Sequence, residues 1–429
     1  MKNSVKNLIE FIDHSPSCFH VIENARKQFL EHGFTELKEK EYWDLEEGKS
    51  YFVTRNGSSM IAFHLPKKDF QGFRIVASHS DSPTYRIKEQ PEMSVEKHYT
   101  KLNIERYGGM IPETWFDRPL SVAGRIIIEE NGQIKDQLVN IDRDLMIIPN
   151  LAIHMSRSSN ESKQLNPQKD LLPLCGGNLT KDGFEEMIAK ESGVEKEDIL
   201  SYDLFLYNRM RGTTLGINEE FVAAPKLDDL ECAYSSIEGM LNAKLSKDYV
   251  TVCAAFDNEE VGSGTKQGAG STFFPEVLKR ISYLCGKNEE EYYMAVADSF
   301  MLSADNAHAV HPNYQDKTDP TNRPYINEGI VLKYNASQKY TTDANSAALV
   351  KYLCKKEKIS CQVFFNRSDM LGGSTLGNIL TGQVSIKAAD IGLPQLSMHS
   401  TYETAGCKDL DDMITLMRSF YELGKEVQI

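Results

Sequence analysis

Hydrophobic and polar positions near the N-terminus follow first a helical and then a strand-like period. Residues 15–30 carry apolar side chains at helical spacing and are followed by Gly33, a residue typical of helix C-termini, so a helix is expected there. The apolar runs 51–54 and 60–63 flank Asn56-Gly57, the dipeptide that favours a tight β-hairpin. The apolar run 73–77 ends in a polar segment, as expected of a buried strand that opens into a loop.

The middle of the chain has a different pattern. Apolar runs at 122–128, 138–141 and 145–148, with a turn signal at Asn131-Gly132, predict β-structure, and a polar stretch follows at 156–169. We therefore expect residues 86–220 to form an inserted, β-rich domain. Residues 1–85 and 221–429 are expected to form a second domain together.

Beyond Pro225 the chain alternates between helix and strand patterns. Residues 228–243 and 275–284 are predicted helices, 249–256 and 292–297 are predicted strands, and further helix and strand signals cover 342–355, 362–365, 377–380 and 385–389. Such alternation predicts an α/β fold, a mostly parallel sheet flanked by helices, with ligands beyond the carboxyl ends of the strands.

The composition narrows the class of protein. The 429 residues include 48 basic and 62 acidic side chains, a formal net charge of −14, so no nucleic acid partner is expected. Apolar runs are far shorter than the ~20 residues of a membrane helix, and the first residues lack a signal-peptide core, so a cytoplasmic protein without a membrane partner is expected. The eight cysteines include no Cys-x-x-Cys pair, which argues against a thiolate zinc site or a disulfide framework.

Side chains of the metal-ligating type follow several of the expected strands. They are His79 and Asp81 after the first, Asp257, Glu259 and Glu260 after the next, then Asp305 and His399, with Asp228 and Asp229 at a helix start. Imidazole together with carboxylate, without cysteine, suits zinc, cobalt or manganese.

Each of these signals has an ordinary structural alternative when it is taken alone. The spacing His79-x-Asp81 puts both side chains on one face of an extended segment, where Asp81 can orient the imidazole or bind metal itself. A glutamate pair such as 259–260 is usually a solvated acidic turn. The aspartate pair 228–229 also suits a helix N-cap, and His399 also suits a core histidine.

Other catalytic motifs are absent from the sequence. No His-Glu-x-x-His motif occurs, and the loop 372–377 lacks the glycine positions of a dinucleotide fingerprint or a nucleophile elbow. Gly373 then belongs either to a turn near a ligand or to a plain structural turn.

Five segments, taken in order, resemble the aspartyl aminopeptidase family of co-catalytic zinc peptidases. They are Ala-Ser-His-Ser-Asp-Ser-Pro at 77–83, Lys-Leu-Asp-Asp at 226–229, Asp-Asn-Glu-Glu-Val-Gly-Ser at 257–263, Ser-Ala-Asp-Asn-Ala-His-Ala-Val-His-Pro-Asn-Tyr at 303–314 and Ser-Met-His-Ser at 397–400. The resemblance covers nearly the whole chain. It implies an α/β metallopeptidase domain interrupted by a β-rich dimerisation domain, with dimers assembled into a homo-oligomeric dodecamer.

The resemblance also implies roles for the site residues. His79 and Asp305 would bind one divalent ion, Glu260 and His399 the other, and Asp228 would bridge the two; Asp81 would orient His79, and Glu259 would be the general base. The implied cofactor is two divalent ions per subunit, Zn²⁺ first and Co²⁺ or Mn²⁺ as alternatives. His154 also matches a family motif but falls in the inserted domain, so we expect it to reach a neighbouring subunit's active site, with direct metal ligation as the alternative.

The expected activity is removal of N-terminal residues from peptides, acidic residues being implied by the resemblance. Two ions can polarise the scissile carbonyl and acidify a water, whose proton Glu259 would take and pass to the leaving amine. Lys333 is the candidate for binding an acidic side chain, a surface lysine being the alternative, and His308 is a candidate pocket residue. The competing hypotheses are a related two-metal deacylase, carboxypeptidase or phosphoesterase, and a non-catalytic assembly protein on the same scaffold.

Overall fold

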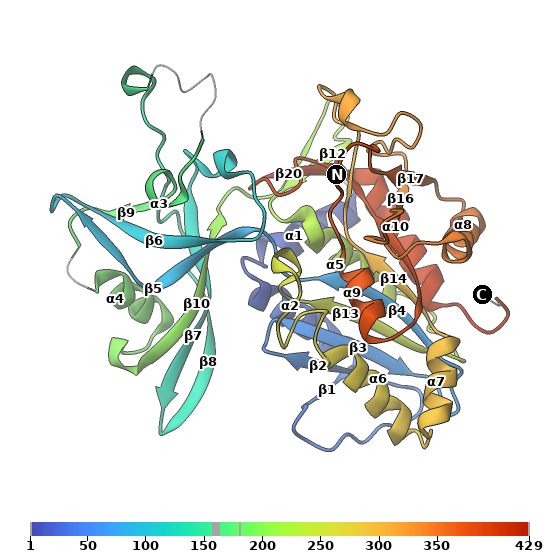
Figure 1. The fold of residues 1–429 in the computed structure, drawn as a ribbon. Coiled ribbons are helices and arrows are strands. Elements are labelled where there is room, and N and C mark those ends of the chain that lie inside the picture. The colour runs from blue at the N-terminus through green and yellow to red at the C-terminus, as the bar shows by residue number, and fades with distance from the viewer. Residues whose placement is uncertain (1, 157–163, 180–181, 428–429) are drawn as a thin grey trace.

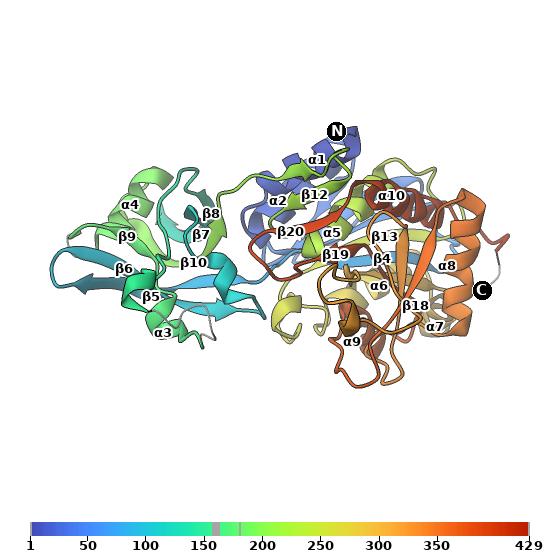
Figure 2. The same ribbon diagram turned by 90° about the horizontal axis from the view of Figure 1, so that it is seen from above.

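The structure, a computed structural model, describes residues 2–156, 164–179 and 182–427. Two bodies lie side by side, a larger α/β body and a smaller body built mainly from strands (Figures 1 and 2). The polar stretch expected at 156–169 falls partly outside the described residues, at 157–163. The first and the last described residues both lie on the larger body (Figure 1).

The larger body is built around a nine-stranded sheet in the described part of the chain, in the order β1-β2-β3-β13-β4-β14-β18-β16-β17. Its strands are β1 (Thr35–Leu37), β2 (Lys49–Arg55), β3 (Ser59–Leu65), β4 (Phe73–His79), β13 (Val250–Phe256), β14 (Phe300–Ala304), β16 (Ile330–Tyr334), β17 (Cys361–Phe365) and β18 (Lys387–Gly392). The four central strands, β13, β4, β14 and β18, are parallel. The expected α/β class with a largely parallel sheet is confirmed.

Helices cover both faces of this sheet, which explains why its central strands are almost continuously apolar. One face packs against α1 (Asn3–Asp13), α2 (Cys18–Glu31), α5 (Leu227–Leu241), α8 (Ala344–Glu357) and α10 (Cys407–Tyr421). The other packs against α6 (Phe273–Leu284), α7 (Glu289–Ala297) and α9 (Leu376–Gln383). Successive residues of β4 alternate between the two cores: Val76 lies in the first, Ile75 and Ala77 in the second.

The predicted hairpin and the predicted helix that precedes it are both present. β2 and β3 pair antiparallel around Asn56 and Gly57, whose φ angles of 59° and 66° are those that a tight turn requires. α2 buries Phe19, Val21, Ile22, Ala25 and Phe29, the apolar positions that predicted it.

The predicted strand at 292–297 is wrong, because these residues belong to the helix α7. A capping box starts this helix: the Asn288 side chain accepts a hydrogen bond from the Glu291 backbone N–H at 3.0 Å, and the Glu291 carboxylate accepts one from the Asn288 N–H at 2.7 Å. These bonds satisfy backbone donors that would otherwise be left without partners at a helix N-terminus. The strand that borders the site, β14, begins only after the helix ends.

The smaller body contains an antiparallel six-stranded sheet in the described residues, in the order β8-β7-β10-β5-β6-β9. Its strands are β5 (Thr84–Val95), β6 (Tyr99–Tyr107), β7 (Leu120–Glu130), β8 (Gln133–Asn140), β9 (Leu174–Gly176) and β10 (Ile199–Asn208). These strands share a separate core with α4 (Gly183–Ser192), and α3 (Pro167–Asp170) is a short helix beside β6. The run 145–148, predicted as β-structure, makes only isolated bridges among the described residues.

A third sheet of five short strands carries the last part of the site. In the described residues its order is β11-β12-β20-β19-β15. The strands are β11 (Thr213–Leu215), β12 (Phe221–Ala224), β15 (Ala307–His308), β19 (Pro394–Leu396) and β20 (Glu403–Gly406). The turn between β19 and β20 holds His399, and α5 begins directly after β12.

Candidate metal centre

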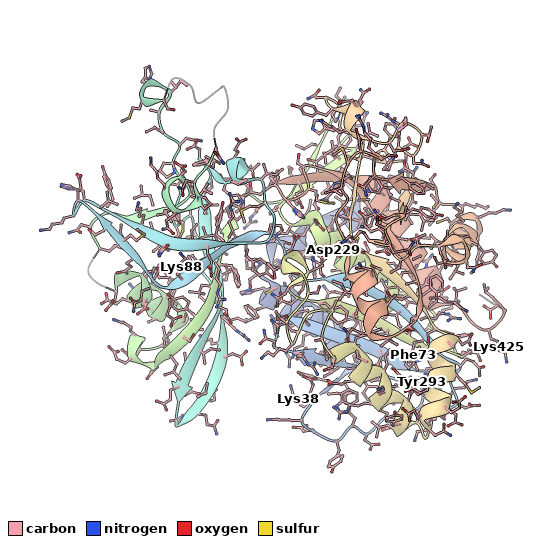
Figure 3. The ribbon with its side chains drawn as sticks, in the orientation of Figure 1. Lys38, Phe73, Lys88, Asp229, Tyr293 and Lys425 are labelled. Carbon is pink, nitrogen blue, oxygen red and sulfur yellow. The ribbon has the colours of Figure 1, made fainter. Side chains whose placement is uncertain are left out.

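The candidate ligands gather at the carboxyl ends of the central strands. His79 is the last residue of β4, Asp305 follows β14 directly, and Glu259 and Glu260 lie on the short 3₁₀ helix η4 (Glu259–Val261) after β13. Parallel strands end at one edge of a sheet, so these loops meet there. Phe73, at the start of β4, lies at the other end of the sheet from Asp229 (Figure 3).

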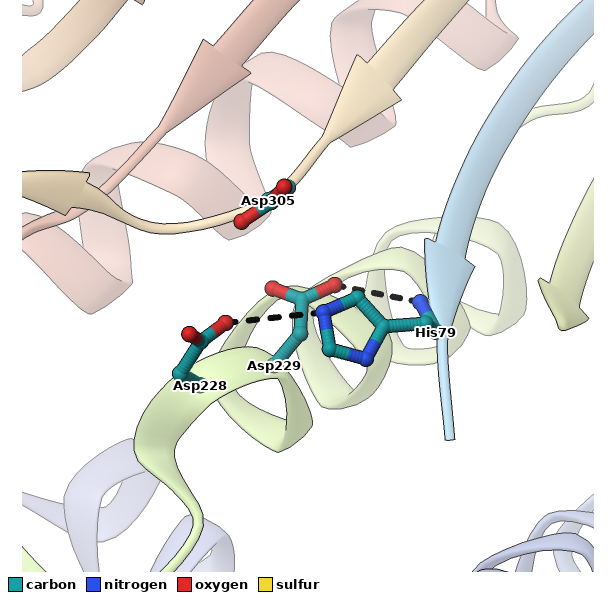
Figure 4. A group of neighbouring side chains, drawn as sticks. All are labelled: His79, Asp228, Asp229 and Asp305. Carbon is teal, nitrogen blue, oxygen red and sulfur yellow. Dashed lines mark hydrogen bonds and ion pairs between the residues drawn. The ribbon is translucent and has the colours of Figure 1, made fainter. Parts of the chain in front are cut away.

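Two further elements complete the cluster. Asp228 and Asp229 lie at the start of α5, both buried, and the peptide bond between them is cis. His399 comes from the turn after β19. Figure 4 shows His79, Asp228, Asp229 and Asp305 converging from three separate elements.

Three overlapping groups of donor atoms, each within 4.8 Å, are present among the described residues. The groups are His79, Asp228, Asp229 and Asp305; His79, Glu259 and Glu260; and Asp228, Glu260 and His399. Asp228 belongs to the first and the third. The structure therefore brings together all six side chains for which the resemblance implies a metal or general-base role, apart from His154.

The spacing of these donor atoms fits a metal centre better than a hydrogen-bonded core. His79 Nε2 lies 3.5 Å from Asp228 Oδ1, and His399 Nε2 lies 3.2 Å from Asp228 Oδ2 and 3.4 Å from Glu260 Oε1. Two donors of one tetrahedral zinc ion, each bonded at about 2.0–2.2 Å, lie roughly 3.3–3.5 Å apart. Asp228 Oδ1 and Glu260 Oε1 are buried and accept no hydrogen bond from any described residue, which is costly unless a cation faces them.

Asp81 positions two of the ligand segments. Its backbone carbonyl lies 3.0 Å from His79 Nδ1, and its carboxylate Oδ1 lies 3.4 Å from the same nitrogen. The same carboxylate accepts hydrogen bonds from the backbone N–H groups of Glu259 and Glu260, at 3.1 and 3.2 Å. Contact with Nδ1 leaves Nε2 of His79 directed at Asp228.

The electrostatics of the cluster favour positive charge. Burial acts to raise the pKa of Asp228, but the imidazoles of His399 and His79 outweigh it and hold this pKa below its ordinary value. Burial acts to lower the pKa of His79, yet Asp229, Asp228 and Asp81 raise it well above the ordinary value. Burial raises the pKa of Glu260 and Asp229 well above the usual range and that of Glu259 to about 8. Carboxylates outnumber imidazoles here, and cations would relieve the excess negative charge.

Glu403, at the start of β20, is a buried residue of the candidate site that the sequence pattern does not reveal. Its Oε2 accepts a hydrogen bond from the Asp228 backbone N–H at 2.9 Å, and its Oε1 accepts one from the His399 N–H at 2.6 Å. One buried carboxylate thus holds the backbones of two candidate ligands. Asp229, which the sequence did indicate, holds the backbone of one candidate ligand, since its Oδ2 accepts the His79 N–H at 3.1 Å.

The candidate substrate residues line a pocket of about 310 Å³ that opens onto the ligands. Lys333 is buried, so the alternative of a surface lysine is wrong. Its Nζ donates to the backbone carbonyls of Asp305 and Asn306, at 2.7 and 3.1 Å. His308 and Gly373 line the same pocket, and a Cβ on Gly373 would meet no described atom within 4 Å.

His154 lies apart from the cluster. It is exposed on the 3₁₀ helix η2 (Ile153–Met155), in the smaller body, and belongs to none of the groups of donor atoms found among the described residues. Leu151, Ile153 and Met155 beside it are also exposed.

A buried imidazole–carboxylate cluster at the carboxyl edge of a largely parallel sheet is the kind of site that metal-dependent hydrolases use. Residues 11–421 match the family model described as "Aminopeptidase I zinc metalloprotease (M18)". The chain belongs to this M18 family. The family that the sequence motifs indicated and the predicted metallo-aminopeptidase function are both confirmed.

Relatives with this description align with nearly the whole chain. A "Probable M18 family aminopeptidase 2" of Clostridium novyi is 45% identical, covering 99% of this chain and 100% of the relative. Its counterpart in Pseudomonas aeruginosa is 37% identical, covering 97% of each chain.

Solved structures share the fold. A cryo-EM structure of the Ape4 and Nbr1 complex matches with a TM-score of 0.94 and 37% identity, covering 97% of this chain and 85% of that one. The S. cerevisiae mApe1 dodecamer matches with a TM-score of 0.85 and 27% identity, covering 98% and 96% of the two chains.

In the described part of the chain, no helix is long and apolar enough to cross a membrane.

Proposed function

We propose that this zinc aminopeptidase site binds two divalent ions per subunit, Zn²⁺ or in its place Co²⁺ or Mn²⁺. His79 and Asp305 would hold one ion, Glu260 and His399 the other, and Asp228 would bridge them. The observation that carries this proposal is the place of Asp228 in two separate groups of donor atoms. A carboxylate can serve two ions because each oxygen bonds one, and Asp228 directs Oδ1 toward His79 and Oδ2 toward His399.

The chain's own residues divide the work of peptide hydrolysis. When bound, the ions polarise the scissile carbonyl and acidify the attacking water. Glu259 is the general base: it lies in the pocket beside His79, where its carboxylate can take a proton from the attacking water and pass it to the leaving amine. Asp81 holds His79 and the Glu259 segment in place.

Peptides with an acidic N-terminal residue are the proposed preferred substrates. Lys333 supports this preference, because it places a buried ammonium group at the wall of the pocket. An ammonium has three donors, and two of those of Lys333 go to backbone carbonyls. The same nitrogen lies 3.6 Å from Asp305 Oδ1, so a substrate carboxylate would meet this ammonium group beside a candidate metal ligand, with His308 and Gly373 lining the same space.

We further propose that the protein is a cytoplasmic homo-oligomer, a dodecamer assembled from dimers through a dimerisation domain at 86–220, with the metallopeptidase domain formed by 1–85 and 221–429. The similarity to the mApe1 dodecamer supports the assembly. The exposed apolar residues around His154 suit a subunit contact, through which His154 would reach a neighbouring subunit's active site. All eight cysteines are free, as is usual in a reducing compartment.

Metal analysis and a peptide panel test the proposed function. The dialysed protein should contain two zinc ions per subunit, and it should cleave Asp- or Glu-initiated peptides but not their N-acetylated counterparts. Glu259→Gln should keep both ions and lower kcat by about 10²–10⁴-fold, the usual contribution of general acid–base catalysis. Glu290→Gln, on the exposed face of α7, is the matched control.

Three outcomes would contradict the proposal. One ion per subunit would remove the bridging role of Asp228. Cleavage of the blocked peptides would favour a deacylase or endopeptidase, and wild-type turnover by Glu259→Gln would exclude Glu259 as the base.

A further inference from the structure

A segment of the smaller body crosses directly over the metal centre. Residues 107–111, here called the crossing segment, connect the end of β6 to the 3₁₀ helix η1 (Pro112–Trp115). In sequence they belong to the inserted region, yet they contact Asp81, Glu260 and His399 of the candidate site. The contacts involve a side chain, two glycines and the backbone, and each is independent of the others.

The first contact is made by the hydroxyl group of Tyr107. It donates a hydrogen bond to Asp81 Oδ2 at 2.7 Å and accepts one from Asn258 Nδ2 at 2.7 Å. The Asp81 carboxylate in turn accepts the backbone N–H groups of Glu259 and Glu260. Tyr107 therefore holds the Asp81 carboxylate, which in turn positions the backbones of the proposed base and of the candidate ligand Glu260.

The second contact requires glycine. Gly108 has a φ of +79°, and a Cβ at this position would lie 3.1 Å from Glu260 Cβ and 3.4 Å from the Glu260 carbonyl oxygen. A Cβ on Gly109 would lie 3.7 Å from His399 Nδ1. The bare backbone thus packs against Glu260 and lies beside His399, and a side chain at 108 would press on Glu260.

The third contact fastens the segment to the turn that holds His399. The Ile111 backbone N–H donates to the His399 carbonyl at 3.0 Å. Just beyond it, Thr401 donates two hydrogen bonds to Thr114: its N–H to Thr114 Oγ1 at 3.0 Å, and its Oγ1 to the Thr114 carbonyl at 2.7 Å. Movement of the crossing segment would displace both ligand loops.

We propose that the crossing segment is a structural part of the metal centre and that Tyr107 is a positioning residue for the reaction. The smaller body then has a role in each subunit's own chemistry, separate from any subunit contact. This inference rests on the proposed ligand set. Partners that orient metal ligands typically contribute 10–100-fold to metal affinity or activity, and Tyr107 acts on two ligand segments at once.

Two pairs of variants separate positioning from general stability. Tyr107→Phe removes only the hydroxyl, and the ring keeps its edge-to-face contact with Phe205 at 5.7 Å. Its control is Tyr202→Phe, also in the smaller body, whose hydroxyl donates to the backbone carbonyls of Lys88 and Glu89 at 2.8 and 2.9 Å. Gly108→Ala is paired with Gly132→Ala, which has a similar φ of +74° but no described atom within 4 Å of the added Cβ.

Zinc affinity of the holoenzyme, measured by titration with a chromophoric chelator, is the main readout, with kcat and KM on an Asp-initiated peptide beside it. Tyr107→Phe and Gly108→Ala should each bind zinc about 10–100-fold more weakly and lose kcat in the same range, with KM within about twofold. The two controls should stay within about twofold of wild type in zinc affinity and kcat.

The outcomes distinguish this inference from the proposed function. Wild-type enzyme that binds zinc, with both test variants unchanged, overturns the inference alone. Equal losses in the test variants and their controls also overturn it, because the effect would then be general destabilisation. Wild-type enzyme that binds no zinc overturns the metal centre and the inference together.

Discussion

Replacing Glu403 by Gln tests how far one buried carboxylate organises the site. The substitution keeps the size and shape of the side chain but turns one acceptor oxygen into an NH₂ group. Both oxygens of Glu403 accept backbone N–H groups, those of Asp228 and His399, at 2.9 and 2.6 Å. Whichever way the amide is oriented, one of the two N–H groups faces another donor, so one ligand loop must shift.

The magnitude follows from the bond that is lost. A hydrogen bond to a charged group contributes about 1.5–3 kcal/mol, and each 1.4 kcal/mol is a factor of ten in an equilibrium constant. If the strain is relieved by moving Asp228 or His399 out of ligand geometry, zinc affinity falls by about 10–150-fold. Burial, followed by the charge of Asp228, raises the pKa of Glu403 well above its ordinary value. Bound cations would favour its ionised form and strengthen both bonds.

Chelator titration of the zinc-loaded enzyme and urea unfolding of the metal-free enzyme measure the two parts of the effect. Glu92→Gln is the matched control: in the smaller body, Glu92 also accepts two backbone N–H groups, from Asp182 at 2.8 Å and from Phe184. We expect similar losses of unfolding free energy in the two variants, but weaker zinc binding only in Glu403→Gln. Zinc affinity of Glu403→Gln within twofold of wild type would refute the reasoning.

Two further predictions concern the surrounding fold. Burial, followed by the charges of Lys226 and Lys27, lowers the pKa of His20 from 6.5 to about 4. The folded state therefore favours neutral His20. This contribution to the unfolding free energy is present above pH 6.5 and is lost as the pH falls toward 4. The unfolding free energy of the metal-free protein should therefore fall by about 2–3 kcal/mol more in wild type than in His20→Gln between pH 7 and pH 4; parallel pH profiles in urea unfolding would contradict this. In α9, a Cβ on Gly377 would lie 2.6 Å from Ser303 Oγ, so Gly377→Ala should lose about 1–3 kcal/mol of unfolding free energy. Gly382→Ala in the same helix meets no described atom within 4 Å and should lose none, so equal urea midpoints for these two variants would disprove the packing argument.

Much of the site could be predicted because its residues follow apolar runs. His79 ends one such run and the glutamate pair 259–260 follows another after two residues, and parallel strands bring their carboxyl ends to one edge. Asp228 and His399 were less visible from pattern alone, since a helix start and a turn between short strands have common structural explanations. For these two residues the family motifs supplied the assignment.

Other residues could not be predicted, for reasons that are also physical. Glu403 acts on Asp228 from 175 positions away, and Tyr107 acts on Asp81 from another sheet. Both belong to polar segments with no ligand spacing, so only the tertiary contact reveals them. The wrong prediction at 292–297 has another cause. The apolar residues there suit a strand, but Asn288 and Glu291, three residues apart, form a capping signal that indicates a helix.

The buried charges explain why the ligand cluster is held so firmly by the rest of the protein. Burial raises the pKa values of Asp229, Glu260 and Glu403 well above the usual range, so a centre without cations must take up protons or repel itself. In the proposed function divalent ions would replace those protons, and metal binding would then be coupled to the same hydrogen bonds that position the candidate ligands. Glu403 accepts the backbone N–H groups of Asp228 and His399, and Asp81 accepts those of Glu259 and Glu260, so these hydrogen bonds hold the four segments in place without a cation. Preorganisation of this kind lowers the cost of binding, since little chain entropy remains to be lost when the ions enter.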